Sequence, residues 1–169
     1  MKKNFALLAF FVIMKSFVYA QTEKFQALYL YNFCKYFQWP NDQRNGNFIF
    51  GIMGRDEKIT SHLKTFVTNK KIGVQPTQVT EFYSYEALEK CQILFVPARY
   101  TKYIPQMLAT CIKNKTLIVS EDEKGIKLGA AVNFLLIDNK LRFELSKSNT
   151  TKFGIDIASS IDNLCYKIY

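Results

Sequence analysis

The sequence predicts a single α/β domain of three layers, in which a mostly parallel sheet carries helices on both faces and ends in an antiparallel hairpin. Three short apolar runs are typical of strands buried on both faces: 48–53, 93–96 and 116–120. Helical patterns separate these runs, and alternating strands and helices indicate βαβ units. The last two strand patterns flank Asp138-Asn139-Lys140, which predicts a tight hairpin turn between 131–137 and 141–145.

The first segment of the domain, Phe25–Pro40, carries an unusually aromatic stripe. Its apolar residues recur at spacings of three, four and seven, the period of one helix face: Phe25, Leu28, Tyr29, Phe33, Tyr36 and Phe37. A residue before proline is pushed out of the α region, so Trp39-Pro40 is expected to end this helix. We expect the stripe to pack on the sheet. The alternative is a partly exposed aromatic surface that receives a partner.

The remaining elements follow in order along the chain. Asp56 is a plausible N-cap for a helix that runs to about residue 67, and alternation predicts a strand over 77–83. Further helices are predicted over 85–90, with Ser84 as the cap, and over 104–112. Apolar residues at helical spacing predict a last helix over 152–169.

Length and composition favour one globular domain. The chain has 169 residues, with 49% hydrophobic and 22% charged residues, which excludes a disordered chain. The formal net charge falls from +9 to +6 without residues 1–20, because these hold three lysines and no acidic residue. The remaining chain has no basic cluster with interleaved aromatic residues, so we expect no nucleic-acid partner.

Residues 1–20 are predicted to be a secretory signal peptide. Lys2 and Lys3 form its charged start, Phe5–Met14 its apolar core, and Val18-Tyr19-Ala20 the cleavage site. The apolar core is shorter than the roughly 20 residues that a membrane-spanning helix needs. We therefore expect cleavage after Ala20 and a periplasmic protein that consists of a single domain over 21–169.

Four cysteines remain after cleavage, an even number that permits two disulfide bonds in an exported protein. Cys91 precedes the strand at 93–96, and Cys111 ends the helix that returns to the same edge of the sheet. A right-handed βαβ unit would bring these two close, so we predict Cys91–Cys111 first and Cys34–Cys165 second. The alternative for Cys34 and Cys165, each on an apolar helix stripe, is a buried free thiol.

The sequence contains no motif for catalysis or for a cofactor, whether GxGxxG, GxxxxGK[ST], HExxH or GxSxG. His62 is the only histidine, and no second residue is placed to orient it. Glu121-Asp122-Glu123 lies in a turn with Lys124, which is typical of a solvated charge cluster. We predict that the protein is not an enzyme and binds neither a cofactor nor a metal ion.

A small-molecule crevice is the alternative kind of site. Open α/β sheets bind ligands outside the carboxyl ends of their strands. Gly54-Arg55 and Pro97-Arg99 follow two predicted strands, which makes Arg55 and Arg99 candidate ligand-binding residues. The protein would then be an exported small-molecule-binding domain that feeds a sensor or a transporter.

Six blocks along the mature chain resemble the YfiR-like family of periplasmic regulatory proteins. In order, they are the Leu-Tyr-Asn-Phe-x-Lys-Tyr-x-x-Trp-Pro run at 30–40 and the blocks 48–54, 88–96, 129–134, 139–144 and 154–160. Ala130-Ala131 stands where the family has a second glycine. Of the family's cysteines, only the one before the third strand is matched, by Cys91.

The resemblance implies an exported, non-catalytic α/β domain. The best understood members repress a membrane-bound diguanylate cyclase by binding its periplasmic domain, and they tend to form homodimers. Our leading hypothesis is therefore a regulatory protein that binds the periplasmic domain of a membrane signalling protein, a diguanylate cyclase or a sensor kinase, and restrains its output.

We expect the C-terminal hairpin and helix to form part of the contact surface, with Phe134, Arg142, Glu144 and Phe153. For Phe134 and Phe143, strand alternation equally favours packing in the core. Arg142 and Glu144 would then be an ordinary exposed feature of the hairpin.

Overall fold

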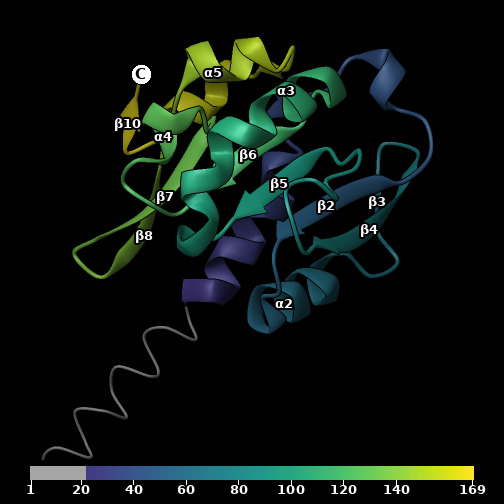
Figure 1. Ribbon diagram of the computed structural model, residues 1–169, viewed down its shortest axis with the longest axis horizontal. Coiled ribbons are helices and arrows are strands. Elements are labelled where there is room, and N and C mark those ends of the chain that lie inside the picture. Colours follow the sequence, from purple (N-terminus) through teal and green to yellow (C-terminus); the bar gives the residue numbers. More distant parts are fainter. Residues whose placement is uncertain (1–21) are drawn as a thin grey trace, which may run out of the picture.

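The computed structural model describes residues 22–169, so the predicted signal peptide lies outside the described residues. Its main sheet has eight strands in the spatial order β10-β8-β7-β6-β5-β2-β4-β3. The strands are β2 (Phe48–Met53), β3 (Lys71–Ile72), β4 (Gln75–Phe82), β5 (Ile93–Val96), β6 (Leu117–Ser120), β7 (Val132–Ile137), β8 (Lys140–Leu145) and β10 (Lys167–Ile168). Figure 1 shows β8 and β10 at one end of the sheet and β3 and β4 at the other.

The centre of the sheet is parallel, from β4 through β2, β5 and β6 to β7. Antiparallel pairing occurs only at the two ends of this sheet, where β8 pairs with β7 and β3 pairs with β4. A separate two-stranded ribbon joins β1 (Phe37–Gln38) to β9 (Asp156–Ile157). The mostly parallel sheet with a closing hairpin is therefore confirmed.

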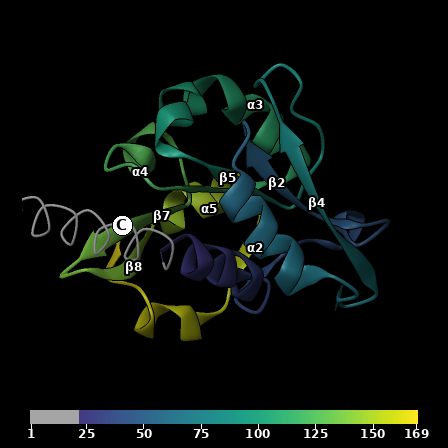
Figure 2. The ribbon, with the colours of Figure 1, turned by 90° about the horizontal axis from the view of Figure 1, so that it is seen from below.

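Helices cover both faces of the sheet. Figure 2 shows α3 (Ile104–Asn114) and α4 (Gly125–Leu128) on one side, with α2 (Glu57–Val67) and the N-terminal helix on the other. Within the described residues, the N-terminal helix runs from 22 to 33. Shorter helical segments are η1 (Asn41–Gln43), η2 (Ala98–Tyr103), α5 (Lys147–Lys152) and η3 (Ser159–Asn163).

Two local sequence signals act as expected. The Asp56 carboxylate accepts a hydrogen bond of 3.2 Å from the Ile59 N–H and so caps α2. Asp138 and Asn139 have φ angles of 50° and 58°, as the two-residue β7–β8 turn requires. Both residues tolerate the left-handed region better than most, so the hairpin register follows from them.

The N-terminal helix is shorter than predicted, and its buried stripe is rotated. It ends at residue 33 because the chain then turns to pair β1 with β9, where the Ala158 N–H donates to the Tyr36 carbonyl at 2.8 Å. Phe25 is 43% exposed, whereas Leu30 and Phe33 are buried. The predicted stripe was therefore wrong at Phe25.

Two predicted helices are absent from the described chain. Residues 85–90 form only a turn, in which the Ser84 hydroxyl accepts a hydrogen bond from the Ala87 N–H at 3.3 Å. Helix nucleation is costly, and a single turn fixes too few residues to propagate a helix. The predicted last helix over 152–169 was also wrong. Gly154, at φ 67°, breaks the helical path after α5, and the following chain forms β9, η3 and β10.

Candidate functional site

The β7–β8 hairpin is fixed to the N-terminal helix by packed aromatic rings. Phe33 lies 6.0 Å from the Phe134 ring and 5.3 Å from the Phe143 ring, centre to centre. These two hairpin residues are cross-strand partners. Phe134 and Phe153 are 2% and 1% exposed, so both support the hairpin from within the core, and their part in a partner contact stays a prediction.

The exposed apolar side chains gather around the hairpin and the C-terminal segment. Of the nine large hydrophobic residues that are exposed in the described chain, six lie there or at the start of the N-terminal helix: Phe25, Leu136, Leu164, Tyr166, Ile168 and Tyr169. We call this region, together with Arg142 and Glu144, the hairpin surface. Arg142 is exposed and Glu144 is partly exposed. A concentration of this kind is typical of protein–protein contact sites.

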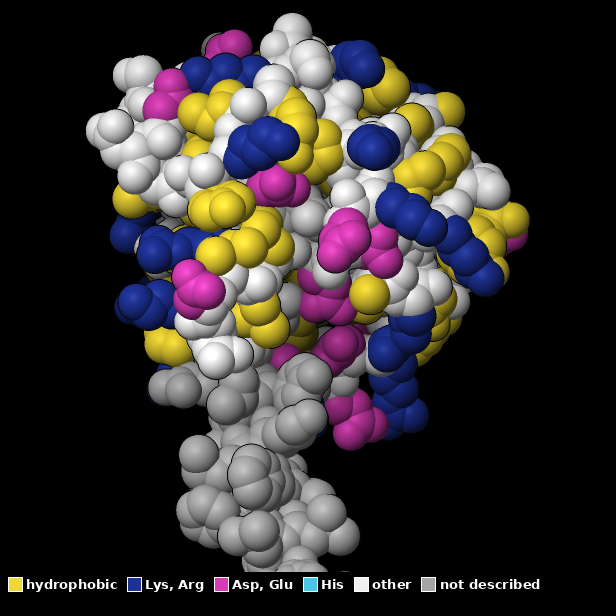
Figure 3. Space-filling view, turned by 90° about the vertical axis from the view of Figure 1, so that its left-hand side faces the viewer, with side chains coloured by type: hydrophobic (Ala, Val, Ile, Leu, Met, Phe, Trp, Pro, Cys, Tyr) yellow, Lys and Arg dark blue, Asp and Glu magenta, His cyan; other side chains and the backbone are white. Residues whose placement is uncertain are grey.

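A groove of about 590 Å³ lies beside the hairpin, between β7, β8 and the loop that follows β6. Its charged lining residues are all glutamates: Glu23, Glu121, Glu123 and Glu144. Figure 3 shows acidic side chains gathered in a hollow on this side of the molecule. We call it the acidic groove.

Three of the glutamates are held in place. The Glu121 carboxylate accepts hydrogen bonds from the Gln26 side-chain amide at 2.7 Å and from the Ala98 N–H at 3.1 Å. The Tyr169 hydroxyl donates to Glu144 at 3.0 Å, and Lys58 lies 3.2 Å from Glu23. The C-terminal residue and the N-terminal helix therefore both help to position the walls of this groove.

A second groove of about 470 Å³ lies at the hairpin tip and has the opposite charge character. Lys140 and Arg142 line it together with Phe25 and Tyr29 of the N-terminal helix. Arg142 and Glu144 therefore line adjacent grooves of opposite charge.

Arg55 and Arg99 do come together at the point where the sheet topology reverses. Strands β4 and β5 lie on either side of β2, so the crevice expected in an open α/β sheet lies between the carboxyl ends of β2 and β5. The Arg99 guanidinium donates to the Arg55 carbonyl, and Arg55 forms an ion pair with Glu57 at 2.7 Å.

The Tyr100 ring lies over this switch point. Gly54 follows β2 at φ 76°, and a Cβ atom there would collide with the Tyr100 ring. The Arg99 guanidinium lies 5.2 Å from the centre of the same ring. Tyr100 thus occupies the space in which a ligand of an open α/β sheet usually binds.

A model of the YfiR/HmsC-like family matches residues 23–164. The chain belongs to this family. The family is one of non-catalytic periplasmic regulators of diguanylate cyclases. The resemblance seen in the six sequence blocks is therefore confirmed. No curated protein matches the chain.

The solved structures that are similar to this YfiR/HmsC-like domain include the ABC domain in complex with L-Trp from Streptococcus pneumonia, with a TM-score of 0.52 and 10% sequence identity. The similarity covers 72% of this chain and 55% of that chain, so the domain spans about half the length of its structural neighbour. At this level of identity the likeness shows the fold alone.

All four cysteines of the YfiR/HmsC-like domain are free thiols in the structure. Cys91 and Cys111 are both fully buried, and Thr116 joins their backbones: its hydroxyl donates to the Cys91 carbonyl at 2.6 Å and its N–H to the Cys111 carbonyl at 2.8 Å. Burial raises the pKa of Cys91 to about 12 and also raises that of Cys111. The pairing of Cys91 with Cys111 stays a prediction.

Cys34 and Cys165 are both partly buried and free, and their pairing also stays a prediction. Burial raises the pKa of both thiols, that of Cys165 to about 11. Within residues 22–169, no group of three or more His, Cys, Asp or Glu side chains is arranged to hold a metal ion. In the same residues, no helix is long and apolar enough to cross a membrane.

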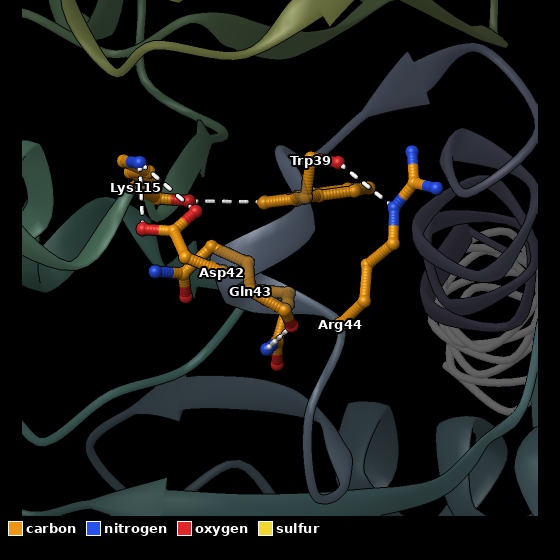
Figure 4. A network of polar contacts seen from close by, with 6 residues as sticks. Trp39, Asp42, Gln43, Arg44 and Lys115 are labelled. Carbon is orange, nitrogen blue, oxygen red and sulfur yellow. Dashed lines mark hydrogen bonds and ion pairs between the residues drawn. The ribbon is translucent and has the colours of Figure 1, made fainter.

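The Trp39-Pro40 block, which carries part of the family resemblance, has a structural role. Figure 4 shows the Trp39 indole N–H donating to the Lys115 carbonyl at 3.0 Å, while the Lys115 ammonium pairs with Asp42 at 2.8 Å. The Arg44 side chain donates to the Trp39 carbonyl at 3.3 Å. Hydrogen bonding to Lys115 lowers the pKa of Asp42. This network joins the chain after the N-terminal helix to the end of α3.

Sequence reasoning missed the acidic groove. Glu121 and Glu123 were visible as a charged turn after a predicted strand, but Glu23 and Glu144 lie far from them in sequence. The position of Glu121 at the carboxyl end of β6 was the one available signal, because strand ends of parallel sheets converge.

Proposed function

We propose that this chain is an exported regulator that binds the periplasmic domain of a membrane-bound signalling protein, a diguanylate cyclase or a sensor kinase, and restrains its output. The family supports the class of activity and the cellular compartment. The gathering of exposed apolar residues on the hairpin surface supports protein binding, and it is the observation that carries the proposal.

The hairpin surface is the part of the chain that we assign to the partner. Leu136 is 46% exposed and Tyr166 54% exposed, so both offer area that a partner can bury. Arg142 and Glu144 would supply charged contacts at the rim, where ion pairs set the orientation of a partner more than the affinity.

The acidic groove predicts the charge of the partner's complementary surface. Four glutamates line it without a lysine or arginine among the lining residues, although the mature chain is basic overall. Complementary potentials speed the encounter of two proteins, and salt screens this effect. We therefore expect the partner to present lysines or arginines to this groove and to bind more slowly at high salt.

The test is capture of the partner from detergent-solubilised membranes of the native cell by the mature protein. Wild type should recover one inner-membrane protein with a cytoplasmic cyclase or kinase output. Leu136→Glu and Tyr166→Glu should each weaken binding at least tenfold, because a buried charge at an interface costs more than about 1.4 kcal/mol. Ile112→Glu on α3, at a residue that is 43% exposed, is the matched control and should bind as wild type.

Glu123→Lys tests the groove separately, with Glu89→Lys as the control, since both glutamates are exposed. The groove variant should slow association, and the control should not. Equal loss in Ile112→Glu and the hairpin variants, or recovery of no membrane protein under both oxidising and reducing conditions, would contradict the proposed function. In cells, loss of the hairpin contact should raise the partner's output, measured as cyclic di-GMP for a cyclase.

A further inference from the structure

The turn between β3 and β4 carries the most exposed large hydrophobic side chain of the described residues. Val74 is 81% exposed and forms the centre of the turn with Gly73, because Ile72 pairs with Gln75. No atom lies within 4 Å of the position that a Cβ atom of Gly73 would take. The turn therefore protrudes from the end of the sheet that lies opposite to the hairpin surface in Figure 1. We call residues 70–74 the β3–β4 tip.

The β3–β4 tip is anchored on both sides. The Gln75 side chain is 6% exposed, and its amide donates to the Gln43 carbonyl at 3.1 Å. On the other side, the Lys70 N–H donates to the Val67 carbonyl at 2.9 Å, and the Lys70 carbonyl accepts from the Thr77 N–H at 3.3 Å. Val74 is therefore presented to solvent by a turn that is bonded to the domain at both of its ends.

The side chains that flank the tip carry unpaired positive charges. Lys70 and Lys71 lie in the tip itself, and Arg44 lies on the loop that follows Gln43; all three are exposed. None of the three forms an ion pair within residues 22–169. Asp42, on the same loop as Arg44, pairs instead with Lys115 at 2.8 Å. The tip therefore joins an exposed apolar apex to cations on either side.

A hollow of about 220 Å³ lies beside Val74 and has an apolar interior. Phe37, Trp39 and Phe48 line it, and all three are buried. The exposed Arg44 side chain also lines it, and its Nε donates to the Trp39 carbonyl at 3.3 Å, as Figure 4 shows. Small-molecule sites usually have volumes of about 300–1,000 Å³. This hollow is smaller, so it suits a few methylene groups beside a cation better than a whole ligand.

We propose that the β3–β4 tip docks on the surface of a bilayer that contains anionic phospholipid. Val74 enters the boundary between headgroups and acyl chains, and Lys70, Lys71 and Arg44 contact the lipid phosphates. Charge complementarity supports this partner, since residues 58–80 contain four lysines and no aspartate or glutamate. The inference rests on the proposed function only for the compartment and for a partner that is bound to the membrane.

The shape of the tip favours a bilayer over an acidic protein. A specific protein interface buries about 800 Å² on each partner around a well-packed apolar centre. The β3–β4 tip instead presents one highly exposed valine at a convex apex. A fluid bilayer needs no complementary shape to accept such an apex, and its anionic headgroups surround the apex on all sides.

Docking at the tip leaves the hairpin surface accessible. The sheet has eight strands between the two sites, from β3 to β10. Neighbouring strands lie about 4.8 Å apart, so the hairpin surface would stand roughly 30 Å above the bilayer. A domain of about 100 residues has a radius of gyration near 13 Å, so the periplasmic domain of a membrane protein reaches this height. Lipid contact would then orient the hairpin surface towards the partner.

Vesicles that contain no protein test the inference directly. The purified mature protein should co-sediment with vesicles of phosphatidylglycerol and phosphatidylethanolamine, bind phosphatidylcholine vesicles much less, and release at high salt. Lys71→Glu should lower the partition coefficient on the anionic vesicles about tenfold, and Val74→Glu at least fivefold. Lys140→Glu and Leu136→Glu are the matched controls, since both residues are exposed at the other end of the sheet. They should bind the vesicles as wild type.

A gain of binding provides the second measurement. Tryptophan prefers the membrane interface, so Val74→Trp should raise the partition coefficient at least threefold, and its fluorescence should shift to the blue when anionic vesicles are added. Leu136→Trp is the control and should show neither change. A wild type that ignores the anionic vesicles, or equal losses in the tip variants and their controls, would overturn the proposal.

The vesicle result is independent of the proposed regulator function. Tip variants that lose capture of a membrane protein, from a chain that does not bind the vesicles, would assign the tip to an acidic protein and so refute lipid docking. Conversely, vesicle binding that is intact in Leu136→Glu while capture of the partner is lost would support both assignments, each at its own end of the sheet.

Discussion

Gly54→Ala tests whether the Tyr100 ring fills the crevice between the carboxyl ends of β2 and β5. Gly54 has φ 76°, and a left-handed conformation costs an alanine about 1–2 kcal/mol. In addition, the new Cβ would collide with the Tyr100 ring, and forcing extra atoms into a packed site typically costs about 1–3 kcal/mol. We therefore expect Gly54→Ala to lower the free energy of unfolding by about 2–5 kcal/mol.

A double-mutant cycle should separate the two parts of this loss of stability, the left-handed conformation and the collision with Tyr100. In a Tyr100→Ala background the ring is gone, so Gly54→Ala should cost only the conformational part, about 1–2 kcal/mol. Gly73→Ala is the matched control, because Gly73 also has a positive φ, 60°, but no atom lies within 4 Å of the position that its Cβ would take. It should cost about 1–2 kcal/mol in either background.

Trp39 provides the assay. It is the single tryptophan of the chain and is 6% exposed, so its fluorescence reports unfolding in urea directly. An equal cost of Gly54→Ala with and without the Tyr100 ring would refute the reasoning that Tyr100 fills this crevice. That result would also reopen the crevice to the small-molecule alternative.

Three further predictions concern buried polar and thiol groups. Trp39→Phe should lower the free energy of unfolding by about 1–3 kcal/mol, because the Lys115 carbonyl loses its donor. Since this variant has no tryptophan, its unfolding in urea is followed by circular dichroism. Under reducing conditions, stability should be full below about pH 9 and fall as the pH rises towards 12. The reason is that Cys91, whose pKa is raised from 9.0 to about 12 by burial, ionises first in the unfolded chain. If Cys91 and Cys111 instead form a disulfide bond, urea titrations of the oxidised protein should lose the part of this alkaline dependence that these two thiols contribute. Hydrogen bonding from Thr60 lowers the pKa of Glu81 below 4.5. The stability that ionised Glu81 contributes is therefore present at neutral pH and is lost as the pH falls through the lowered pKa. Thr60→Val should reduce this acid dependence of stability, measured in thermal melts.

The parallel centre of the fold was predictable because its signals are local and strong. Strands β5 and β6 are buried along their whole length, and continuous apolar runs are what such strands require. The Asp56 cap and the Asp138-Asn139 turn are likewise short-range features, each specified by one or two residue types. Order along the chain then implied the βαβ connections.

The C-terminal segment was not predictable from spacing. Phe153 and Ile161 fit a helical period, and both are buried, but they reach the core from the end of α5 and from η3. What decides the outcome is long-range pairing: β9 with β1 and β10 with β8. Tertiary contacts of this kind override a weak local preference.

The orientation of the predicted contact residues depends on a long-range contact in the same way. Alternation along β7 and β8 placed Phe134 and Arg142 on opposite faces, but one sequence does not say which face meets solvent. The Phe33 ring settles it, because it stacks on Phe134 and so turns Arg142 outwards. The partner-binding role of these residues stays a prediction.

The distribution of exposed apolar side chains favours protein contacts over a ligand crevice. Of the nine exposed large hydrophobic residues in the described chain, six lie at the hairpin surface and two, Val74 and Tyr83, flank the β4 edge. At the carboxyl ends of β2 and β5, where α/β proteins usually bind small molecules, Tyr100 and Arg99 instead pack against the domain itself. A sheet whose crevice is filled and whose exposed apolar residues gather at the hairpin end is better suited to binding a protein there than to binding a small molecule.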